Sequence, residues 1–142
     1  MTTVNQILQR TTRKVVTISA KASVYQALEL MMIADIGALP VIENDVLVGI
    51  FSERDYARKC ILKGKKSSDT LVADLMSTTV VTVKPEQKID DCMQYMTTHR
   101  IRHLPVIVGN KIIGMVSIGD VVNTIISEQA KVIQQLESYI TS

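Results

Sequence analysis

The sequence predicts an α/β fold built from two copies of one β-α-β-β-α unit that pack together. Segments of the chain match each other at a constant offset of 65 residues, as Leu39-Pro40-Val41-Ile42 matches Leu104-Pro105-Val106-Ile107. Short β-branched runs alternate with segments of helical periodicity in both copies. One copy alone would bury too little surface to be stable, so we expect the two halves to form one unit.

The first copy opens with a strand and a capped helix. The β-branched run at 15–18 predicts a short strand. Ser23 and Gln26 have the spacing of a capping box, which opens a helix. Its apolar residues then recur at helical spacing (Val24, Leu28, Met31 and Met32). Gly37 is expected to end this helix.

A β-hairpin and a second helix follow in the first copy. The run 39–42 predicts a strand entered through Pro40, since proline is tolerated among a strand's first residues. Polar residues 43–45 predict a tight turn, and the run 46–51 predicts the return strand. Ser52 is expected to cap a helix that runs to about Leu62 and ends in a loop with Gly64.

The second copy repeats this order. We expect strands at 80–83, 104–108 and 112–116, a helix at 85–98, and a turn at Gly109-Asn110. A final helix begins after Ser117. Related short segments, at 4–8 and 72–76, precede the two copies. The predicted boundaries are 1–70 for the first repeat and 71–142 for the second.

The final helix is much longer than its counterpart in the first copy. It is predicted from about Ile118 towards Ile140, with apolar residues spaced mostly by three and four. This stripe either folds back on its own domain or contacts a partner. Exposed apolar stripes usually mark partners, so we favour a homodimer formed through the faces of the repeats and this helix.

Composition excludes several classes of protein. A net charge of +2 gives no electrostatic reason for nucleic-acid binding, and no apolar run reaches the length of a membrane span. Cys60 and Cys92 have neither metal nor redox spacing, which favours a reducing compartment. His99 and His103 are four apart but lack an evident third ligand for a metal. The acid-free N-terminus resembles a transit peptide faintly, but strand structure begins too early, and we expect a cytoplasmic protein.

The matched motifs resemble a tandem cystathionine-β-synthase (CBS) domain pair, or Bateman module. They are Val16-Thr17, Leu39-Pro40-Val41-Ile42 and Gly49-Ile50-Phe51-Ser52-Glu53-Arg54-Asp55, with the second set at Val81-Thr82, Leu104-Pro105-Val106-Ile107 and Gly114-Met115-Val116-Ser117-Ile118-Gly119-Asp120. The resemblance covers about residues 4–127 and is nearest to stand-alone pairs of bacteria and plant organelles. It implies two repeats about a pseudo-twofold axis, with two clefts for adenosine ligands: AMP, ADP, ATP, NAD or S-adenosylmethionine.

The resemblance assigns the ribose hydroxyls of such a ligand to Asp55 and Asp120. This chemistry is reasonable because a carboxylate accepts hydrogen bonds from two vicinal hydroxyls, and a helix start favours a nearby anion. Ser52 and Ser117 would lie towards the phosphate or ribose. The same Ser-x-x-Asp pattern also caps helices that bind nothing, so capping remains an alternative role.

The two clefts are expected to be unequal. The resemblance places Arg54, Arg102 and His103 around Asp55, where they suit a phosphate, and Thr82 and Val83 at the base pocket. Thr17, Ile18, Gly37 and Ala38 would line the cleft of Asp120 and Ser117, which has little cationic charge. Pro40 and Pro105 complete the predicted ligand-binding set. We therefore expect AMP to bind more tightly at Asp55, although a solvated basic pair is the alternative for Arg102 and His103.

The predicted function is that of a sensor for an adenine nucleotide, AMP foremost. Ligand binding would be transmitted by a conformational or dimer change to a regulated partner protein, with no required cofactor. The alternative is an interaction module that dimerises and regulates a partner with empty clefts. No catalytic constellation is evident, so we do not expect an enzyme.

Overall fold

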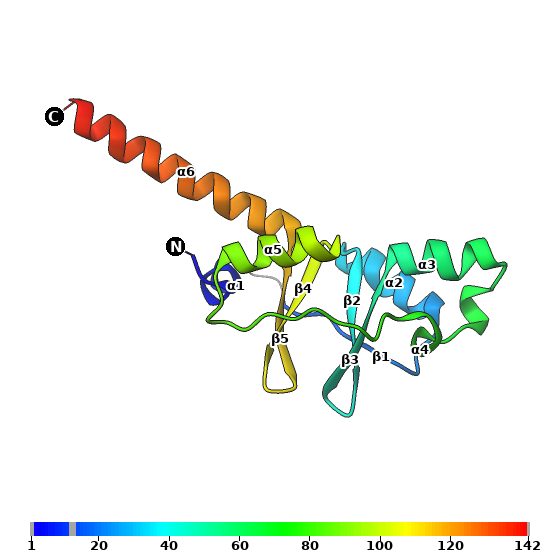
Figure 1. Cartoon of the computed structure of the whole chain (residues 1–142). Coiled ribbons are helices and arrows are strands. Elements are labelled where there is room, and N and C mark those ends of the chain that lie inside the picture. The colour runs from blue at the N-terminus through cyan, green and yellow to red at the C-terminus, as the bar shows by residue number, and fades with distance from the viewer. Residues whose placement is uncertain (1, 12–13, 142) are drawn as a thin grey trace.

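A computed structural model of the chain describes residues 2–11 and 14–141. Two β-hairpins lie next to each other, with helices along one end of both and the last helix reaching away from the body (Figure 1). The elements, in chain order, are α1 (Val4–Arg10), β1 (Ile18–Ser19), α2 (Val24–Ala34), β2 (Ala38–Glu43), β3 (Val46–Ser52), α3 (Glu53–Lys59), η1 (Ile61–Lys63), η2 (Ser67–Asp69), α4 (Val72–Leu75), α5 (Ile89–His99), β4 (His103–Val108), β5 (Lys111–Ser117) and α6 (Ile118–Thr141). The predicted mixed α/β class with a long C-terminal helix is confirmed.

Both predicted hairpins are present and have equivalent geometry. β2 pairs antiparallel with β3, and β4 with β5, each with a shift of register at the same place, after Val41 and after Val106. The first turn places Asn44 and Asp45 at φ 51° and 63°. Two successive left-handed residues make the tight turn whose twist matches paired strands, and Asn and Asp tolerate that conformation best among residues with a side chain.

The first strand of each copy is shorter than predicted. β1 pairs parallel to β2 only at Ile18 and Ser19, and the second copy retains a single bridge from Val83 to Val106. A β-branched run favours an extended backbone whether or not that backbone pairs. Most of each run is extended chain with no partner strand.

Two helix boundaries also differ from the prediction. α2 begins with the predicted capping box at Ser23, but its C-cap is Asp35 at φ 54°, before Gly37. α5 begins at Ile89 rather than at Pro85. The backbone carbonyls of Pro85 and Gln87 instead accept hydrogen bonds from the N–H groups that open α1, at 2.9 and 2.7 Å. The segment before α5 thus holds α1 in place.

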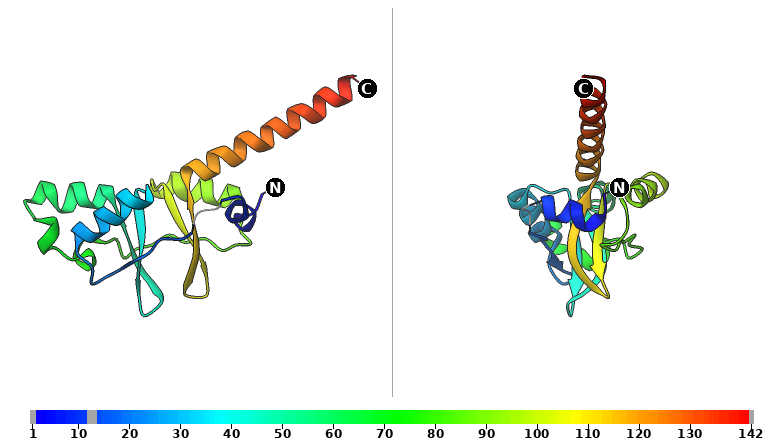
Figure 2. Two further views of the ribbon diagram at one scale, coloured as in Figure 1. Left: turned by 180° about the vertical axis from the view of Figure 1, so that it is seen from behind. Right: turned by 90° about the vertical axis from the view of Figure 1, so that its left-hand side faces the viewer.

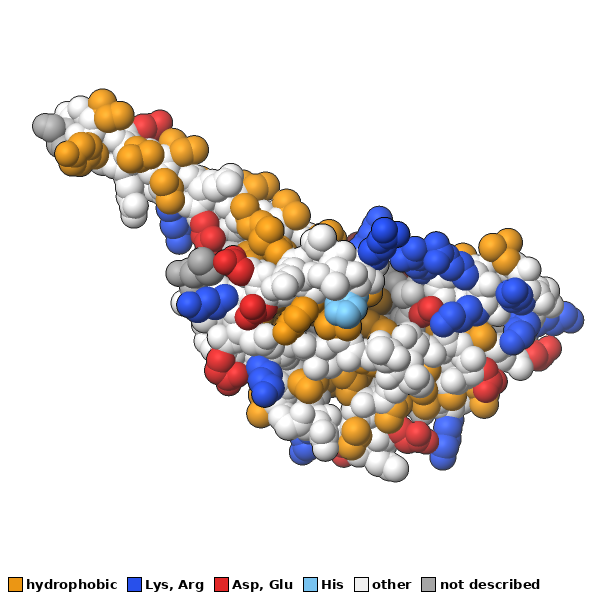
Figure 3. Space-filling view, in the orientation of Figure 1, with side chains coloured by type: hydrophobic (Ala, Val, Ile, Leu, Met, Phe, Trp, Pro, Cys, Tyr) orange, Lys and Arg blue, Asp and Glu red, His pale blue; other side chains and the backbone are white. Residues whose placement is uncertain are grey.

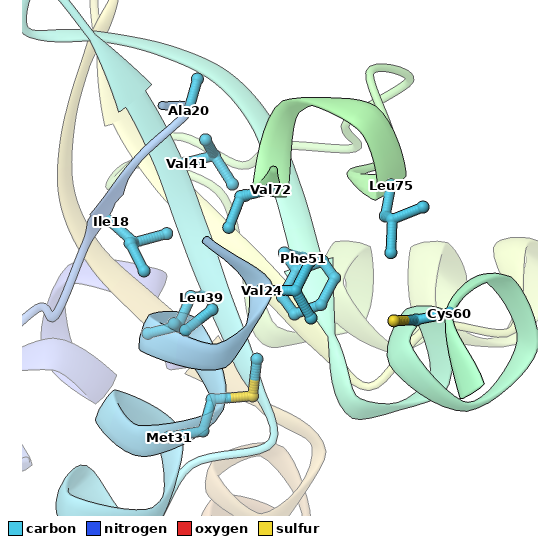
Figure 4. Close-up of a cluster of buried hydrophobic side chains, with 11 residues drawn as sticks. Ile18, Ala20, Val24, Met31, Leu39, Val41, Phe51, Cys60, Val72 and Leu75 are labelled. Atoms are coloured by element: carbon cyan, nitrogen blue, oxygen red, sulfur yellow. The ribbon is translucent and has the colours of Figure 1, made fainter. Parts of the chain in front are cut away.

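The two repeats exchange their short leading helices. α1 contributes Val4 and Ile7 to the core of the second repeat. α4 contributes Val72 and Leu75 to the core of the first, where they lie around Phe51 (Figure 4). Each core therefore contains a segment from beyond its own β-α-β-β-α unit.

The exchange explains why a glycine recurs in the return strand of each hairpin. A Cβ at Gly49 would lie 2.6 Å from Met76 Sδ and 2.9 Å from the backbone oxygen of Ser77. That oxygen accepts a hydrogen bond from the N–H of Ile50 at 3.0 Å. The chain that follows α4 thus crosses directly over Gly49.

We expect Gly49→Ala to lower the free energy of unfolding by about 1–3 kcal/mol, because the overpacked contact involves backbone that cannot move without breaking the Ile50–Ser77 pairing. Gly114→Ala is the matched control: the atoms nearest to its Cβ would be the Leu8 methyl groups, at 2.7 and 2.9 Å, and a side chain can rotate away. Urea denaturation measures both losses. An equal or larger loss for Gly114→Ala would contradict this explanation.

α6 leaves the body and continues into solvent (Figure 2). Its 24 residues make it the longest of the described helices. Within residues 2–11 and 14–141, no helix has both the length and the apolar character that a membrane crossing requires.

A ligand-sized cavity between the repeats

The paired Ser and Asp residues of both repeats cap helices. In α3, Ser52 Oγ accepts a hydrogen bond from the N–H of Asp55 at 3.1 Å, and Asp55 Oδ2 accepts one from the N–H of Ser52 at 2.9 Å. Ser117 and Asp120 form the same two bonds at the start of α6, again at 3.1 and 2.9 Å. The capping role that the sequence left open is therefore confirmed at both sites. A ligand would have to use the remaining acceptor capacity of each carboxylate.

Lys59 is a neighbour of Asp55 that the motif comparison missed. Its Nζ lies 3.1 Å from Asp55 Oδ1 and donates a hydrogen bond to the backbone oxygen of Leu75 at 3.1 Å. The signal was present in the sequence, because an acid and a base four apart on a helix are neighbours. Both oxygens of the Asp55 carboxylate are thus engaged within the chain, and a ribose there would compete with Lys59.

A cavity of about 340 Å³ lies between the two repeats on the side of Ser117. Its walls come from both copies and are mostly apolar, with a few polar groups. The lining residues are Leu8, Thr11, Lys14, Val15, Val16, Ala34, Ile36, Ala38, Pro40, His103, Ile113, Gly114, Met115 and Ser117. The structure thus brings four of the predicted site residues together here: Ala38, Pro40, His103 and Ser117.

His103 is one of the predicted site residues that line this cavity. The sequence assigned it to the cleft of Asp55, whereas the structure places it in the cavity with Ser117. The reason is that His103 opens β4 and pairs with Ser117 across the hairpin. Its ring also faces the first repeat, since a Cβ at Gly37 would lie 3.8 Å from His103 Cε1. This cavity therefore contains the imidazole that the sequence analysis assigned to the cleft of Asp55.

Lys14 adds a cationic side chain to the lining of the cavity, and the sequence comparison did not select it. It lies in the segment between α1 and β1, which has no motif and no matching charge in the second copy. Arg54 and Arg102, the cations expected beside Asp55, are both exposed. Figure 3 shows Lys and Arg side chains gathered over the part of the surface where α3 lies. The exposure of Arg102 thus fits the alternative in which it belongs to a solvated basic pair.

Other predicted site residues lie outside this cavity. Ile18 and Val83 are buried in the two hydrophobic cores. The extended chain just before them lines the cavity in the first copy, through Val15 and Val16. Asp120 faces a smaller cavity of about 190 Å³, which shares Thr11 with the first. This smaller cavity is lined by Ile7, Arg10, Thr11, Asp120, Asn123, Thr124 and Ser127.

The remaining predicted residues are not grouped around a described cavity. Pro105 is buried next to Leu104, while Thr82 and Gly37 are half-buried. Among the described residues, no group of three or more His, Cys, Asp or Glu side chains is placed to hold a metal ion. Burial raises the pKa of the Cys92 thiol to about 11, with the charge of Asp91 adding to the effect. Cys92 is therefore a protonated core residue at neutral pH, not a nucleophile.

Two interlocked α/β repeats of the same element order, with a cavity between them, define a tandem-repeat module. The chain belongs to the CBS domain family, whose model matches residues 4–61 and 72–127. The resemblance to a CBS pair that the sequence motifs indicated is confirmed.

Curated relatives support this assignment. The chain is 46% identical over 123 residues to the "CBS domain-containing protein CBSX3, mitochondrial" of Arabidopsis thaliana, covering 83% of this chain but only 60% of the plant protein. It is 36% identical to the "CBS domain-containing protein YhcV" of Bacillus subtilis, covering 84% of this chain and 85% of that protein. Since the plant relative is named as mitochondrial, the cytoplasmic location stays a prediction.

Solved structures show the same fold. A putative signal-transduction protein with CBS domains from Burkholderia ambifaria MC40-6 superposes with a TM-score of 0.86 at 46% identity, covering 90% of this chain and 96% of that one. The CBS domain pair of protein MJ0100, in complex with 5'-methylthioadenosine and S-adenosyl-L-methionine, has a TM-score of 0.80 at 22% identity, with coverages of 90% and 98%. At this identity the likeness to MJ0100 shows the fold alone.

Proposed function

We propose that this chain is a regulatory module that binds an adenosine ligand, AMP foremost and otherwise ADP, ATP or NAD, in the cavity at Ser117. The observation that carries the proposal is the cavity itself, which unites apolar walls from both repeats with Ser117, His103 and Lys14. Its volume of about 340 Å³ falls within the roughly 300–1,000 Å³ of small-molecule sites.

The cavity offers separate partners for the base and the phosphate of a nucleotide. The apolar side chains of Val16, Ala38 and Met115 suit the faces of an aromatic base. Ser117 lies at the start of the long helix α6, whose dipole favours negative charge there. His103 and Lys14 supply donors for a phosphate. This arrangement favours the opposite ranking of the two clefts from the one expected from the sequence, with the tighter site at Ser117.

Regulation would follow from the position of the cavity between two interlocked units. Its lining includes Leu8 at the end of α1 and Ser117 at the start of α6. A ligand that binds one arrangement of these elements better than another shifts the population towards it. Ligand binding would change the direction of α6 relative to the body, and a regulated partner protein would respond to that change.

A thermal-shift screen with AMP, ADP, ATP, NAD, S-adenosylmethionine and 5'-methylthioadenosine tests the binding proposal. A ligand at one hundred times its Kd stabilises the folded state by about 2.7 kcal/mol, so the Tm should rise by several degrees. We expect AMP to give the largest rise. Flat curves for all six compounds would contradict nucleotide sensing.

The exposed apolar side of α6 favours a second function, that of an interaction module which acts through its partners alone. Val132, Ile133 and Leu136 are each more than half exposed. This function requires no ligand, and flat thermal-shift curves would support it.

A further inference from the structure

One face of α6 carries an apolar row in heptad spacing. Its positions are Val122, Ile126, Gln129, Ile133, Leu136 and Ile140, separated alternately by four and three residues. This is the a/d pattern of a coiled coil, with isoleucine at successive a positions and valine, glutamine and leucine at d. The pattern continues for nearly three heptads, to the end of the described helix.

The body of the protein contacts a different face of α6. Val121 and Thr124 are the buried residues of this helix. Glu128 accepts hydrogen bonds from the backbone N–H and the hydroxyl of Thr2, which fixes that side of the helix against the N-terminal segment. The heptad residues are open in comparison, from 47% exposure at Val122 to 80% at Ile140. Residues 131–141 are all exposed.

Such a helix needs a partner to remain ordered. An isolated helical segment of about a dozen residues is marginal in water, and most helical stability comes from packing of an apolar face. The outer part of α6 adds β-branched residues at 132, 133 and 140, whose helix propensity is below that of alanine. Packing must therefore come from outside the chain.

We infer that α6 pairs with α6 of a second copy of this chain as a parallel two-stranded coiled coil. Isoleucine occupies the a positions and Leu136 one d position, and β-branched a residues combined with leucine at d favour two strands. The apolar side chains of the heptad row are 47–80% exposed, so pairing of two copies would remove from water apolar surface that the body leaves open.

The charges of α6 argue against a lipid surface as the occupant. The helix carries Asp120, Glu128 and Glu137 against one Lys131. Helices that lie on membranes are rich in Lys and Arg on the polar face. In a pair of α6 helices these charged side chains would stay outside the seam, since none of them belongs to the heptad row.

Gln129 decides the orientation of the pair. In a parallel pair it meets Gln129 of the second copy, and the two amides can hydrogen-bond to each other. In the antiparallel register that aligns the apolar rows, it would face Ile133 of the second copy and leave its amide unpaired. A buried polar group without a partner is costly, so the parallel pair is favoured, as polar core residues in coiled coils specify register.

Sedimentation or light scattering across a dilution series tests the pairing. Ile133→Glu should raise the dimer dissociation constant about 30-fold or more, because it buries a charge in the seam. Gln135→Glu adds the same charge on the outer side of the helix and is expected to leave the dimer unchanged. A monomeric parent chain, or a dimer that survives Ile133→Glu, would overturn the inference.

Oxidative cross-linking tests the orientation. In the parallel pair, Gln129→Cys should form a disulfide with its copy, whereas Gln135→Cys should not; the native Cys60 and Cys92 are fully buried. Lack of the Gln129→Cys cross-link in a dimeric sample would overturn the parallel arrangement. The nucleotide thermal shift, measured on Ile133→Glu, separates this inference from the proposed function: loss of the dimer leaves the cavity in place.

Discussion

Phe51→Ala is expected to lower the free energy of unfolding by about 3–5 kcal/mol, the largest effect of any single truncation in this chain. Phe51 is the largest fully buried side chain in residues 2–11 and 14–141, and it lies at the end of β3 among residues of α2, α3 and α4. Val24, Cys60 and Leu75 surround it (Figure 4). Truncation leaves a cavity in contact with several elements, which cannot all move inward to fill it. Urea denaturation followed by circular dichroism measures the loss.

The matched control is Val116→Ala, at the equivalent position of the second core, which removes fewer carbon atoms from a fully buried site. Its loss should be smaller. Phe51→Leu retains most of the volume and keeps the experiment interpretable if Phe51→Ala fails to fold. A loss below about 1 kcal/mol for Phe51→Ala would show that the site collapses freely, contrary to the packing described here.

The exchange of α1 and α4 between the repeats predicts how Phe51→Ala unfolds. Because each core contains a helix from outside its own repeat, loss of the first core should carry the second with it. Amide hydrogen exchange at Leu104 and Val106, which belong to the second core, should therefore speed up together with exchange in the first. Separate transitions for the two cores would contradict this coupling.

Local chemistry predicted the elements of this fold well. The capping box at Ser23, the turn at 43–45 and both hairpins are decided by neighbouring residues, and the structure confirms them. The strand at 80–83 fails because strand formation needs a partner, and only Val83 finds one. The prediction that a helix begins within 85–88 is wrong for a related reason. The backbone carbonyls of Pro85 and Gln87 accept hydrogen bonds from α1, which lies near the N-terminus.

The candidate site shows the same division between local and long-range information. The repeat offset of 65 residues identified Ser52, Asp55, Ser117 and Asp120, and their local geometry is the same in both copies. The side of the axis on which His103 lies depends on how the hairpins pack, which no local pattern encodes. Lys14 carries no motif, and only the folded chain places it at the cavity.

The double variant Lys14→Gln/His103→Gln should weaken AMP binding by about 10- to 100-fold while leaving 5'-methylthioadenosine binding within a few-fold. Charge-assisted hydrogen bonds to a phosphate contribute about 1.5–3 kcal/mol, and the exposure of Lys14 reduces its share. 5'-Methylthioadenosine has the same base and ribose without a phosphate, so it reports the apolar walls alone. The matched control is Arg54→Gln/Arg102→Gln, which removes the cations first assigned to the cleft of Asp55. Calorimetry with both ligands compares the variants. A larger loss of AMP affinity in the arginine variant would indicate that the phosphate binds near Asp55. An equal loss of affinity for both ligands in the Lys14/His103 variant would show that the cavity itself had changed.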